Sequence, residues 1–272
     1  MWNKDFLKSE EIELSTSFDR DGYVIRPVSD IQLFNEVRKL VVEKAAAILG
    51  ATVDSPDHFL NEIHEHLRLE DLNKFRLEVI RSINAEKKFR SDYFRLARET
   101  FETLVGNELA MQLRVNLSIQ LPRDDGSLLP VHADVWSGDS PFEVVVWTPL
   151  VDCYGTKAMY ILPPKSDQKL REEFSRYAGG SSEQLFERIE HEVVWVEIKA
   201  GEVLIFNQNL PHGNRVNTET ETRWSMNCRF KGVFTPYGDK KLGEFFEPIT
   251  LKAATRTGMS YRFPVLKDGV DQ

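Results

Sequence analysis

Two histidines and an aspartate in this sequence have the types and spacing of metal ligands. The segment PVHADVWSG places His132 and Asp134 two positions apart, and LPHGN supplies His212 about 80 residues later. Side chains two apart on a strand point to the same face, so His132 and Asp134 can converge on one atom if they end a strand. Two histidines and one carboxylate form the facial triad that holds non-haem Fe(II) and leaves coordination positions open. The pair alone also fits a histidine and an aspartate that end a strand without any metal.

Arg223 follows His212 by eleven residues and adds a cation to this set. A guanidinium can bind both oxygens of a carboxylate at once, which suits it to clamp an acidic ligand. The alternative is a surface ion pair worth under about 1 kcal/mol. A competing cluster, His58, His64 and His66, lies in HFLNEIHEHL, whose pattern predicts a helix. Side chains two apart on a helix diverge, so we expect this cluster to consist of solvated helix residues.

The composition bounds the class of protein. The chain has 272 residues, of which 41% are hydrophobic and 29% charged, as in an ordinary globular protein. No apolar run approaches the roughly 20 residues of a membrane span, and the polar start does not resemble a signal peptide, so we expect a cytoplasmic protein without a membrane partner. Cys153 and Cys228 are too few for a disulfide framework and are expected to be buried thiols. The net charge of −8, without a basic block, argues against a nucleic-acid partner.

The elements before residue 111 are expected to be mainly helical. Residues 18–27 predict a turn followed by a short strand, because Asp-Gly precedes the β-formers YVI. Ser29 and Gln32 have the spacing of a capping box, and Gly50 ends the apolar periodicity that follows, which predicts a helix between them. Further helical patterns cover about 56–67, 70–85 and 91–105.

A strand periodicity begins at Met111. In MQLRVNLSIQLP, four polar side chains alternate with apolar ones and predict one strand whose polar face carries Arg114, Asn116, Ser118 and Gln120. Further strands are predicted in FEVVVWTPLV, AMYILP, VVWVEI, GEVLIFN, RWSMNCRF and FFEPITLK, with a helical insertion at about 166–191. Many short strands separated by turns favour an antiparallel sandwich or barrel such as a jelly roll. We therefore expect a mainly β fold with packed helices, in a single domain over 1–272: a helical part, 1–110, and a jelly-roll core, 111–272.

In their order and spacing, His132, Asp134, His212 and Arg223 resemble the Fe(II)/2-oxoglutarate-dependent dioxygenases, whose fold is a cupin-like double-stranded β-helix, or jelly roll. Four stretches are similar to the phytanoyl-CoA dioxygenase-like branch: DGYVIRPV, VVVWTPLVD, AMYILPPKS and GEVLIFNQNLPHGNRVN. Within that branch the chain is most similar to oxygenases of bacterial carbohydrate (capsule) biosynthesis clusters. The resemblance spans about residues 19–232. PPKS replaces the glycine-containing turn of the family, so loop roles there are not carried over.

The resemblance implies that His132, Asp134 and His212 hold the catalytic Fe(II), and that 2-oxoglutarate and O2 are cosubstrates. The C5 carboxylate of 2-oxoglutarate would pair with Arg223. The other candidate cosubstrate contacts are Ser225, Trp147, Asn214, Thr148 and Asn116. Succinate and CO2 would be released while the substrate is hydroxylated, or while an alcohol becomes a carbonyl. Because Asp134 leaves no ligand position vacant for a halide, halogenation is not expected.

A small polar substrate is expected from the polar strand face, since an acyl chain would need apolar walls. With the resemblance, this favours a sugar or a nucleotide-linked sugar. Candidate substrate contacts are Arg114, Gln120 and Arg229, and phosphate charge could also come from Lys252, Arg256 and Arg262, each of which also fits a surface charge. The alternatives are a cupin-like sugar isomerase or epimerase and a non-catalytic sugar-binding jelly roll. The sequence leaves the oligomeric state open, and a homo-oligomer is one of the options. It also leaves open whether residues 233–272 cover the site or close the sheet.

Overall fold

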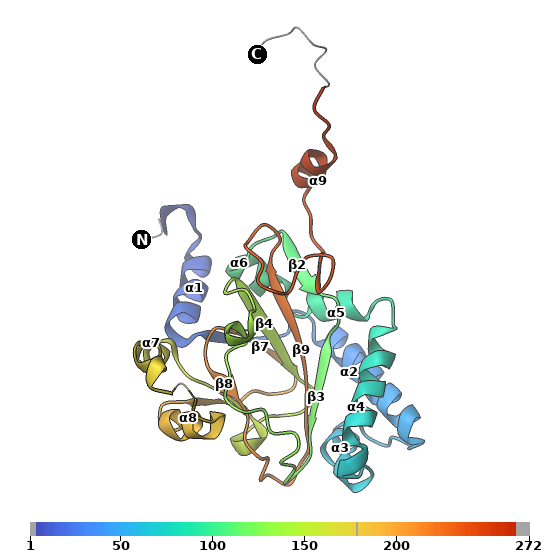
Figure 1. Ribbon diagram of the computed structural model, residues 1–272. Helices are drawn as coiled ribbons and strands as arrows, with labels where there is room; N and C mark the ends of the chain where they lie inside the picture. The colour runs from blue at the N-terminus through green and yellow to red at the C-terminus, as the bar shows by residue number, and fades with distance from the viewer. Residues whose placement is uncertain (1–3, 178, 265–272) are drawn as a thin grey trace.

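Two antiparallel sheets pack against each other in the computed structural model, which describes residues 4–177 and 179–264 (Figure 1). The larger sheet has the order β1-β7-β4-β9-β2-β10, and β3 also pairs with β9. Its strands are β1 (Tyr23–Pro27), β2 (Leu109–Gln112), β3 (Asn116–Gln120), β4 (Glu143–Pro149), β7 (Glu202–Asn207), β9 (Arg223–Gly232) and β10 (Phe246–Pro248). The smaller sheet, in the order β6-β5-β8, contains β5 (Met159–Ile161), β6 (Val194–Val196) and β8 (His212–Gly213). The predicted β core with helices packed outside it is confirmed.

Most helices before the core cover the outer face of the larger sheet, whereas the first α-helix lies beside β1 (Figure 1). The helices before the core are α1 (Ser9–Asp21), α2 (Ile31–Leu49), α3 (Pro56–Asn61), α4 (Leu69–Asn84), α5 (Phe89–Arg95) and α6 (Arg98–Leu104), with the 3-10 helices η1 (Lys4–Phe6) and η2 (Ile63–Glu65). The later ones are η3 (Asp134–Ser137), η4 (Gly155–Lys157), α7 (Pro164–Glu173), η5 (Phe174–Tyr177), α8 (Ser182–Ile189) and α9 (Ala253–Ser260). The predicted helical insertion therefore corresponds to α7, η5 and α8.

Local signals set the ends of α2. The side chain of Asp30 accepts hydrogen bonds from the backbone N–H groups of Gln32 and Leu33, which caps the helix one residue after the predicted Ser29. Gly50 ends it in the left-handed region, with φ of 65°, as its position in the sequence predicts.

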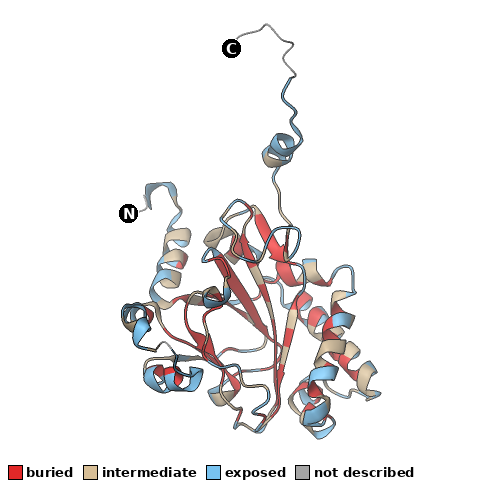
Figure 2. Ribbon diagram, in the orientation of Figure 1, coloured by how far each residue is buried: buried red, intermediate tan, exposed pale blue. Residues whose placement is uncertain are grey.

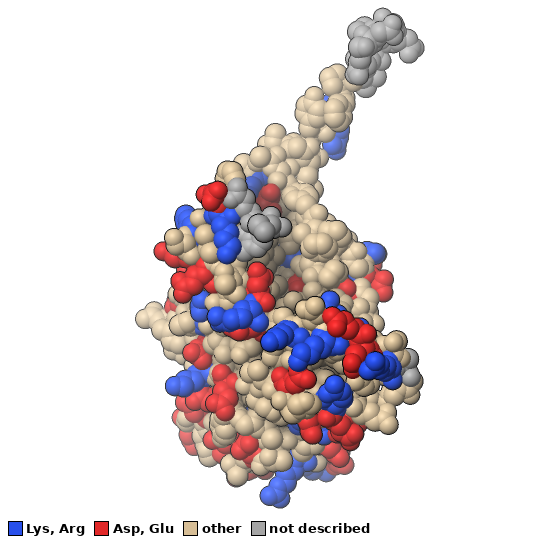
Figure 3. Space-filling model, turned by 90° about the vertical axis from the view of Figure 1, so that its left-hand side faces the viewer, with Lys and Arg blue, Asp and Glu red and all other residues tan. Residues whose placement is uncertain are grey.

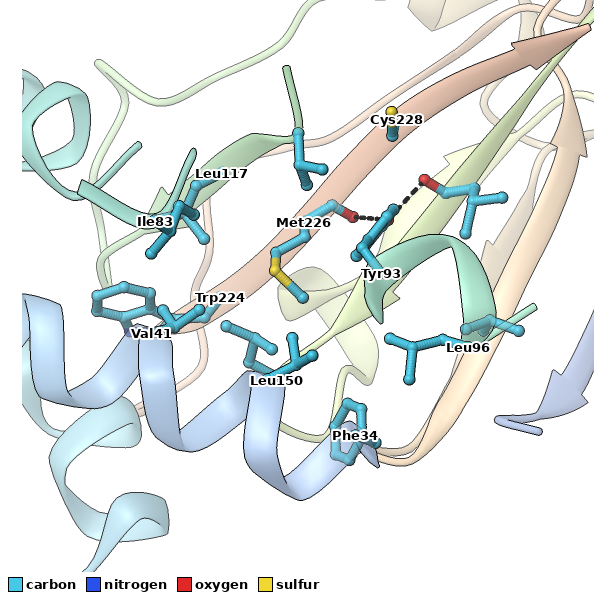
Figure 4. Close-up of a cluster of buried hydrophobic side chains, with 14 of the residues drawn as sticks. Phe34, Val41, Ile83, Tyr93, Leu96, Leu117, Leu150, Trp224, Met226 and Cys228 are labelled. Carbon is cyan, nitrogen blue, oxygen red and sulfur yellow. Dashed lines mark hydrogen bonds between the residues drawn. The ribbon is translucent and has the colours of Figure 1, made fainter. Parts of the chain in front are cut away.

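The period-2 alternation of the strands divides the larger sheet into two faces. Side chains such as Trp224 and Met226 of β9 pack against Val41 of α2 and Ile83 of α4 in one apolar cluster (Figure 4). The alternate side chains of β4 and β7 pack against the smaller sheet in a second cluster. Buried residues accordingly concentrate in the strands and on the helix sides that face them (Figure 2). One face of the sheet is thus closed by helices, and the other is available to build a site.

The predicted strand over 111–121 is wrong in its first half. The six residues from Met111 to Asn116 lie opposite only four residues of β9, from Phe230 to Asn227, so the two extra residues bend outward between β2 and β3. Asn84, at the end of α4, fixes this bend through hydrogen bonds to the backbone N–H and carbonyl of Val115. The alternation is broken at this point, and Arg114 is exposed in the bend instead of facing the interior of the barrel.

The predicted turn at residues 18–22 is also wrong in part, because α1 continues to Asp21 before β1 begins as predicted. Only Leu14 of this helix is buried, so its apolar periodicity is weak. Gly22 ends the helix with φ of 79°. A Cβ at Gly22 would lie 2.1 Å from Cδ1 of Leu210, so a glycine allows the strand to approach the turn before His212.

The described residues after β9 close the sheet and then leave it. β10 pairs with β2, and the arm that carries α9 projects from the body (Figure 1). No residue of α9 is buried, and residues 265–272 lie outside the described residues. Acidic and basic side chains are interspersed over the body in the face shown in Figure 3. None of the helices in the described part of the chain is long and apolar enough to cross a membrane.

Tyr93 joins the helical layer to the sheet and can be tested by substitution. Its hydroxyl lies 3.1 Å from the carbonyl oxygen of Val146 and 3.4 Å from that of Met226 (Figure 4). It also accepts a hydrogen bond from the Thr148 hydroxyl. We expect Tyr93→Phe to lower the free energy of unfolding by about 1–2 kcal/mol in urea titrations, because buried polar partners lose their hydrogen bonds. Tyr261→Phe, at an exposed position, is the control, and equal stability of both variants would contradict the assignment.

Candidate functional site

His132, Asp134 and His212 meet at the open edge between the two sheets. The backbone N–H of His132 donates to the carbonyl of His212 at 3.0 Å, and that of His212 donates to the carbonyl of His132 at 2.8 Å. Asp134 is the first residue of the 3-10 helix η3. His132 forms only an isolated β-bridge with His212, so His132 and Asp134 do not lie at the end of a full strand. One potential ligand atom from each of the three residues lies within 4.8 Å of the others. No other cluster of this kind occurs among residues 4–177 and 179–264.

The backbone orients both imidazole rings. Nδ1–H of His132 donates to the carbonyl of Pro130 at 2.9 Å, and Nδ1–H of His212 donates to that of Leu210 at 2.8 Å. With the proton on Nδ1, each Nε2 keeps a lone pair for a metal. Burial, together with the neighbouring charge of His132, lowers the pKa of His212 to about 4. The ring is therefore neutral at pH 7, which is the form that coordinates.

The carboxylate of Asp134 is kept ionised by its neighbours. Burial alone would raise its pKa, but opposing effects outweigh burial, the largest of them the charge of the Arg229 guanidinium, so the net pKa lies below the usual value. Oδ2 lies 2.9 Å from a terminal guanidinium nitrogen of Arg229, while Oδ1 lies 3.6 Å from Nε2 of His132. Two imidazole nitrogens and one carboxylate oxygen thus face a common centre, which fits a facial triad for Fe(II).

A pocket of about 140 Å³ extends from these ligands into the barrel. Its wall contains Ser118, Leu129, His132, Asp134, Val145, Trp147, Met159, Phe206, His212, Gly213, Asn214, Arg223, Asn227 and Arg229. Gly213 is required for close packing here, because a Cβ on it would lie 2.6 Å from the Tyr160 hydroxyl and 2.7 Å from the Leu129 carbonyl oxygen. The pocket therefore has both a candidate metal centre and space beside it for a small ligand.

Arg223 is a buried cation in this pocket without a carboxylate partner. Its terminal nitrogens approach the Ala158 carbonyl and the Ser118 hydroxyl at only 3.4 Å, and Nε has no hydrogen-bond partner. No carboxylate of residues 4–177 or 179–264 forms an ion pair with it. Burial lowers its pKa to about 10, so it remains protonated at neutral pH. An unpaired buried guanidinium fits an anionic ligand such as the distal carboxylate of 2-oxoglutarate.

Two of the other predicted cosubstrate residues line the pocket. Trp147 faces it from β4, and Asn214 faces it from the turn after β8. The side-chain amide of Asn214 is already engaged, since it accepts from the backbone N–H of Leu129 and donates to the carbonyl of Ser127. Thr148 does not reach the pocket, because adjacent strand residues face opposite sides and its hydroxyl donates to Tyr93.

The remaining predicted residues lie around the pocket. Ser225 shares the face of Arg223, and its buried Oγ has no hydrogen-bond partner. Asn116 donates to Asn227 at 3.2 Å, and Gln120 donates to the carbonyl of Arg215 at 2.6 Å, but neither side chain lines the wall. Arg114 is exposed in the bend before β3 and is outside the pocket. Arg229 does line the wall, with its guanidinium on Asp134.

Sequence reasoning missed several wall residues. Asn227 could have been found, because it follows Arg223 and Ser225 on the same alternating face of β9. The apolar residues Val145, Met159 and Phe206 gave no signal that separates a pocket wall from a core. Of the competing histidines, His58 and His66 are exposed, as expected. His64 departs from the expectation, because it is half-buried in η2 and its Nδ1 lies 3.0 Å from Oγ1 of Thr222. Cys153 and Cys228 are buried free thiols, also as expected.

A jelly roll that holds two histidines, an aspartate and an unpaired arginine in one pocket defines the class of non-haem Fe(II)- and 2-oxoglutarate-dependent oxygenases. The family model described as Phytanoyl-CoA dioxygenase (PhyH) matches residues 18–224, and the chain belongs to this family. It is accordingly an oxidoreductase that uses Fe(II) and 2-oxoglutarate. No match to the chain is found among curated proteins.

Solved structures confirm the jelly-roll fold. The non-haem monooxygenase ThoJ in complex with nickel has a TM-score of 0.57 at 15% identity, covering 89% of this chain and 85% of that chain. SnoK, an alpha-ketoglutarate-dependent carbocyclase from nogalamycin biosynthesis, has a TM-score of 0.55 at 16% identity, covering 92% and 99%. HygX from Streptomyces hygroscopicus, with nickel and 2-oxoglutarate bound, has a TM-score of 0.50 at 16% identity, covering 85% and 89%.

The depressed pKa of His212 predicts a pH dependence of stability in the metal-free protein. The folded pKa of about 4 lies below the ordinary 6.5, so stability from the neutral ring is complete above about pH 6.5 and is lost as the pH falls toward 4. The shift corresponds to about 3 kcal/mol. Urea titrations of chelator-treated protein should show this fall, and His212→Gln should show a shallower one. Equal pH dependence in the two proteins would refute burial of the neutral ring.

Proposed function

We propose that His132, Asp134 and His212 hold the Fe(II) and that Arg223 binds the C5 carboxylate of 2-oxoglutarate. Ser225, on the same face of β9 as Arg223, would add a hydrogen bond to the same carboxylate, and Trp147 and Asn214 would contact the cosubstrate from the pocket wall. Fe(II), when bound with 2-oxoglutarate and O2, supplies the oxidation that releases succinate and CO2 and either hydroxylates the substrate or converts its alcohol to a carbonyl. The protein's own residues fix the orientation of the ligands and exclude water from the buried end of the pocket.

The observation that carries this proposal is the unpaired Arg223. A buried guanidinium without a carboxylate destabilises the fold unless a ligand supplies the missing charge. Ser225, two residues further on the same face, has a buried hydroxyl without a partner. Both groups fit a carboxylate that enters beside the metal ligands, and neither is explained by packing alone.

For the substrate, we propose a sugar or a nucleotide-linked sugar of polysaccharide biosynthesis. Support comes from the resemblance to carbohydrate-cluster oxygenases and from the polar groups of Ser118 and Asn227 in the pocket wall. Trp136 adds a further reason. It lies on the same 3-10 helix as Asp134, its side chain is 41% exposed, and its ring packs against Phe174 with centroids 5.0 Å apart. Such an exposed aromatic face suits the apolar C–H face of a sugar ring.

Anaerobic titration with Fe(II) and 2-oxoglutarate tests the site. We expect a weak visible charge-transfer band in the wild type and its loss in His132→Ala and His212→Ala, because each variant removes one ligand. Adding nucleotide-linked sugars in air should then release succinate from the wild type only. If both variants keep the wild-type iron affinity, the ligand assignment fails.

Within the same titration, Arg223 is tested by a matched pair. Arg223→Gln should raise the 2-oxoglutarate concentration for half-saturation about 100-fold at unchanged iron affinity, since a buried charge-assisted pair is lost. Arg223→Lys keeps the charge without the planar fork and should recover only part of this affinity. An unaltered 2-oxoglutarate requirement in Arg223→Gln would remove the assignment.

The sugar proposal is tested at Trp136. Trp136→Ala should raise the KM for the active sugar about tenfold, a loss typical of an aromatic contact, while the Fe(II) and 2-oxoglutarate titration stays as in the wild type. Phe234→Ala, at a position 69% exposed and not on the 3-10 helix that carries Asp134, serves as the control. Equal KM values in the two variants would exclude stacking on Trp136.

A further inference from the structure

Arg229 joins the aspartate ligand to a buried polar network. One terminal nitrogen of its guanidinium lies 2.9 Å from Oδ2 of Asp134 and 3.6 Å from Oδ2 of Asp139. Its Nε donates to Oε1 of Gln208 at 3.0 Å. Only 16% of the Arg229 side chain is exposed, so these contacts are formed largely out of water. The arginine thus holds one oxygen of the carboxylate and leaves the other free.

The network also fixes Arg229 itself. The amide of Gln208 donates to Oε2 of Glu143 at 3.0 Å and to the carbonyl of Ser140 at 3.2 Å, which orients its oxygen toward the guanidinium. Asp139 is in turn paired with Lys240 at 2.6 Å. The carbonyl of Gln208 accepts the backbone N–H of Asp134 at 3.1 Å. The side chain of Gln208 therefore positions Arg229, and the backbone carbonyl of Gln208 positions Asp134.

The two oxygens of Asp134 differ in what surrounds them. Oδ1 faces Nε2 of His132, whereas Oδ2 is occupied by Arg229. A carboxylate can bind a metal through one or both oxygens, and binding through both would take a position from a triad that has to leave three open. We propose that Arg229 is a positioning residue that restricts Asp134 to one coordinating oxygen and so keeps the position open for the 2-oxoglutarate chelate.

This role replaces the substrate contact expected from the sequence. Asp134 and Asp139 already neutralise the guanidinium, and Gln208 accepts a hydrogen bond from it. A substrate phosphate would have to compete with these partners, whereas Arg223 has no such partners. The inference rests on the proposed function, because it requires Asp134 to be a metal ligand.

The test uses the full chain loaded with Co(II), whose visible absorption reports coordination number and geometry. Arg229→Gln should change the Co(II) spectrum before any 2-oxoglutarate is added and raise the half-saturating 2-oxoglutarate concentration by about tenfold or more. Arg229→Lys should restore the spectrum in part, because its ammonium can still occupy Oδ2. Asp139→Asn should shift both readouts in the same direction by less. Arg81→Gln, at an exposed position of α4, is the control.

The outcomes separate this inference from the proposed function. If Arg229→Gln folds, as shown by the thermal midpoint of the metal-free protein, and its Co(II) spectrum coincides with that of the wild type, the positioning role is overturned. A rise only in the substrate KM, with an unchanged spectrum and 2-oxoglutarate requirement, would return Arg229 to substrate binding. If the wild type binds Co(II) no better than His212→Ala, the metal site itself fails, which is a different result.

Discussion

The register of β9 is the constraint on which both halves of the molecule depend. Trp224, Met226 and their alternate neighbours face the apolar layer under the helices, while Arg223, Asn227 and Arg229 line the pocket. Because side chains alternate with a period of two, a slip of one residue would exchange the two sets. An arginine would then enter the apolar layer without a partner, which costs several kcal/mol. The helical layer and the candidate site therefore stabilise the same pairing of this strand.

Two arginines of that strand show how the pocket divides its charges. Arg229 meets the carboxylates of Asp134 and Asp139 inside the protein, so its charge is balanced before any ligand enters. Arg223 meets only a carbonyl and a hydroxyl at 3.4 Å. The first arginine organises the candidate metal centre, and the second leaves a place for an anion. A ligand that supplies this anion binds the folded chain and not the unfolded one, and so stabilises the fold.

Periodicity was sufficient to predict most strands and the end of α2 at Gly50, because those signals are local. The set His132, Asp134, His212 and Arg223 could also be predicted, since its members require each other chemically. The bend at Arg114 could not, because it depends on Asn84 of a distant helix. The contact of Arg229 with Asp134 is likewise tertiary. Thr148, by contrast, could have been excluded from the sequence, since strand alternation prevents it from sharing a face with Trp147.

The mutual backbone hydrogen bonds of His132 and His212 have a consequence for the order of events in a newly made chain. The two residues are about 80 positions apart, so closing the bridge costs more chain entropy than closing a local turn. Neither segment alone presents the full ligand set, and an unfolded chain holds His132 and Asp134 close together but not His212. Metal capture is thus expected to follow folding, and the abundance of a competing metal during synthesis matters less than its abundance around the finished protein.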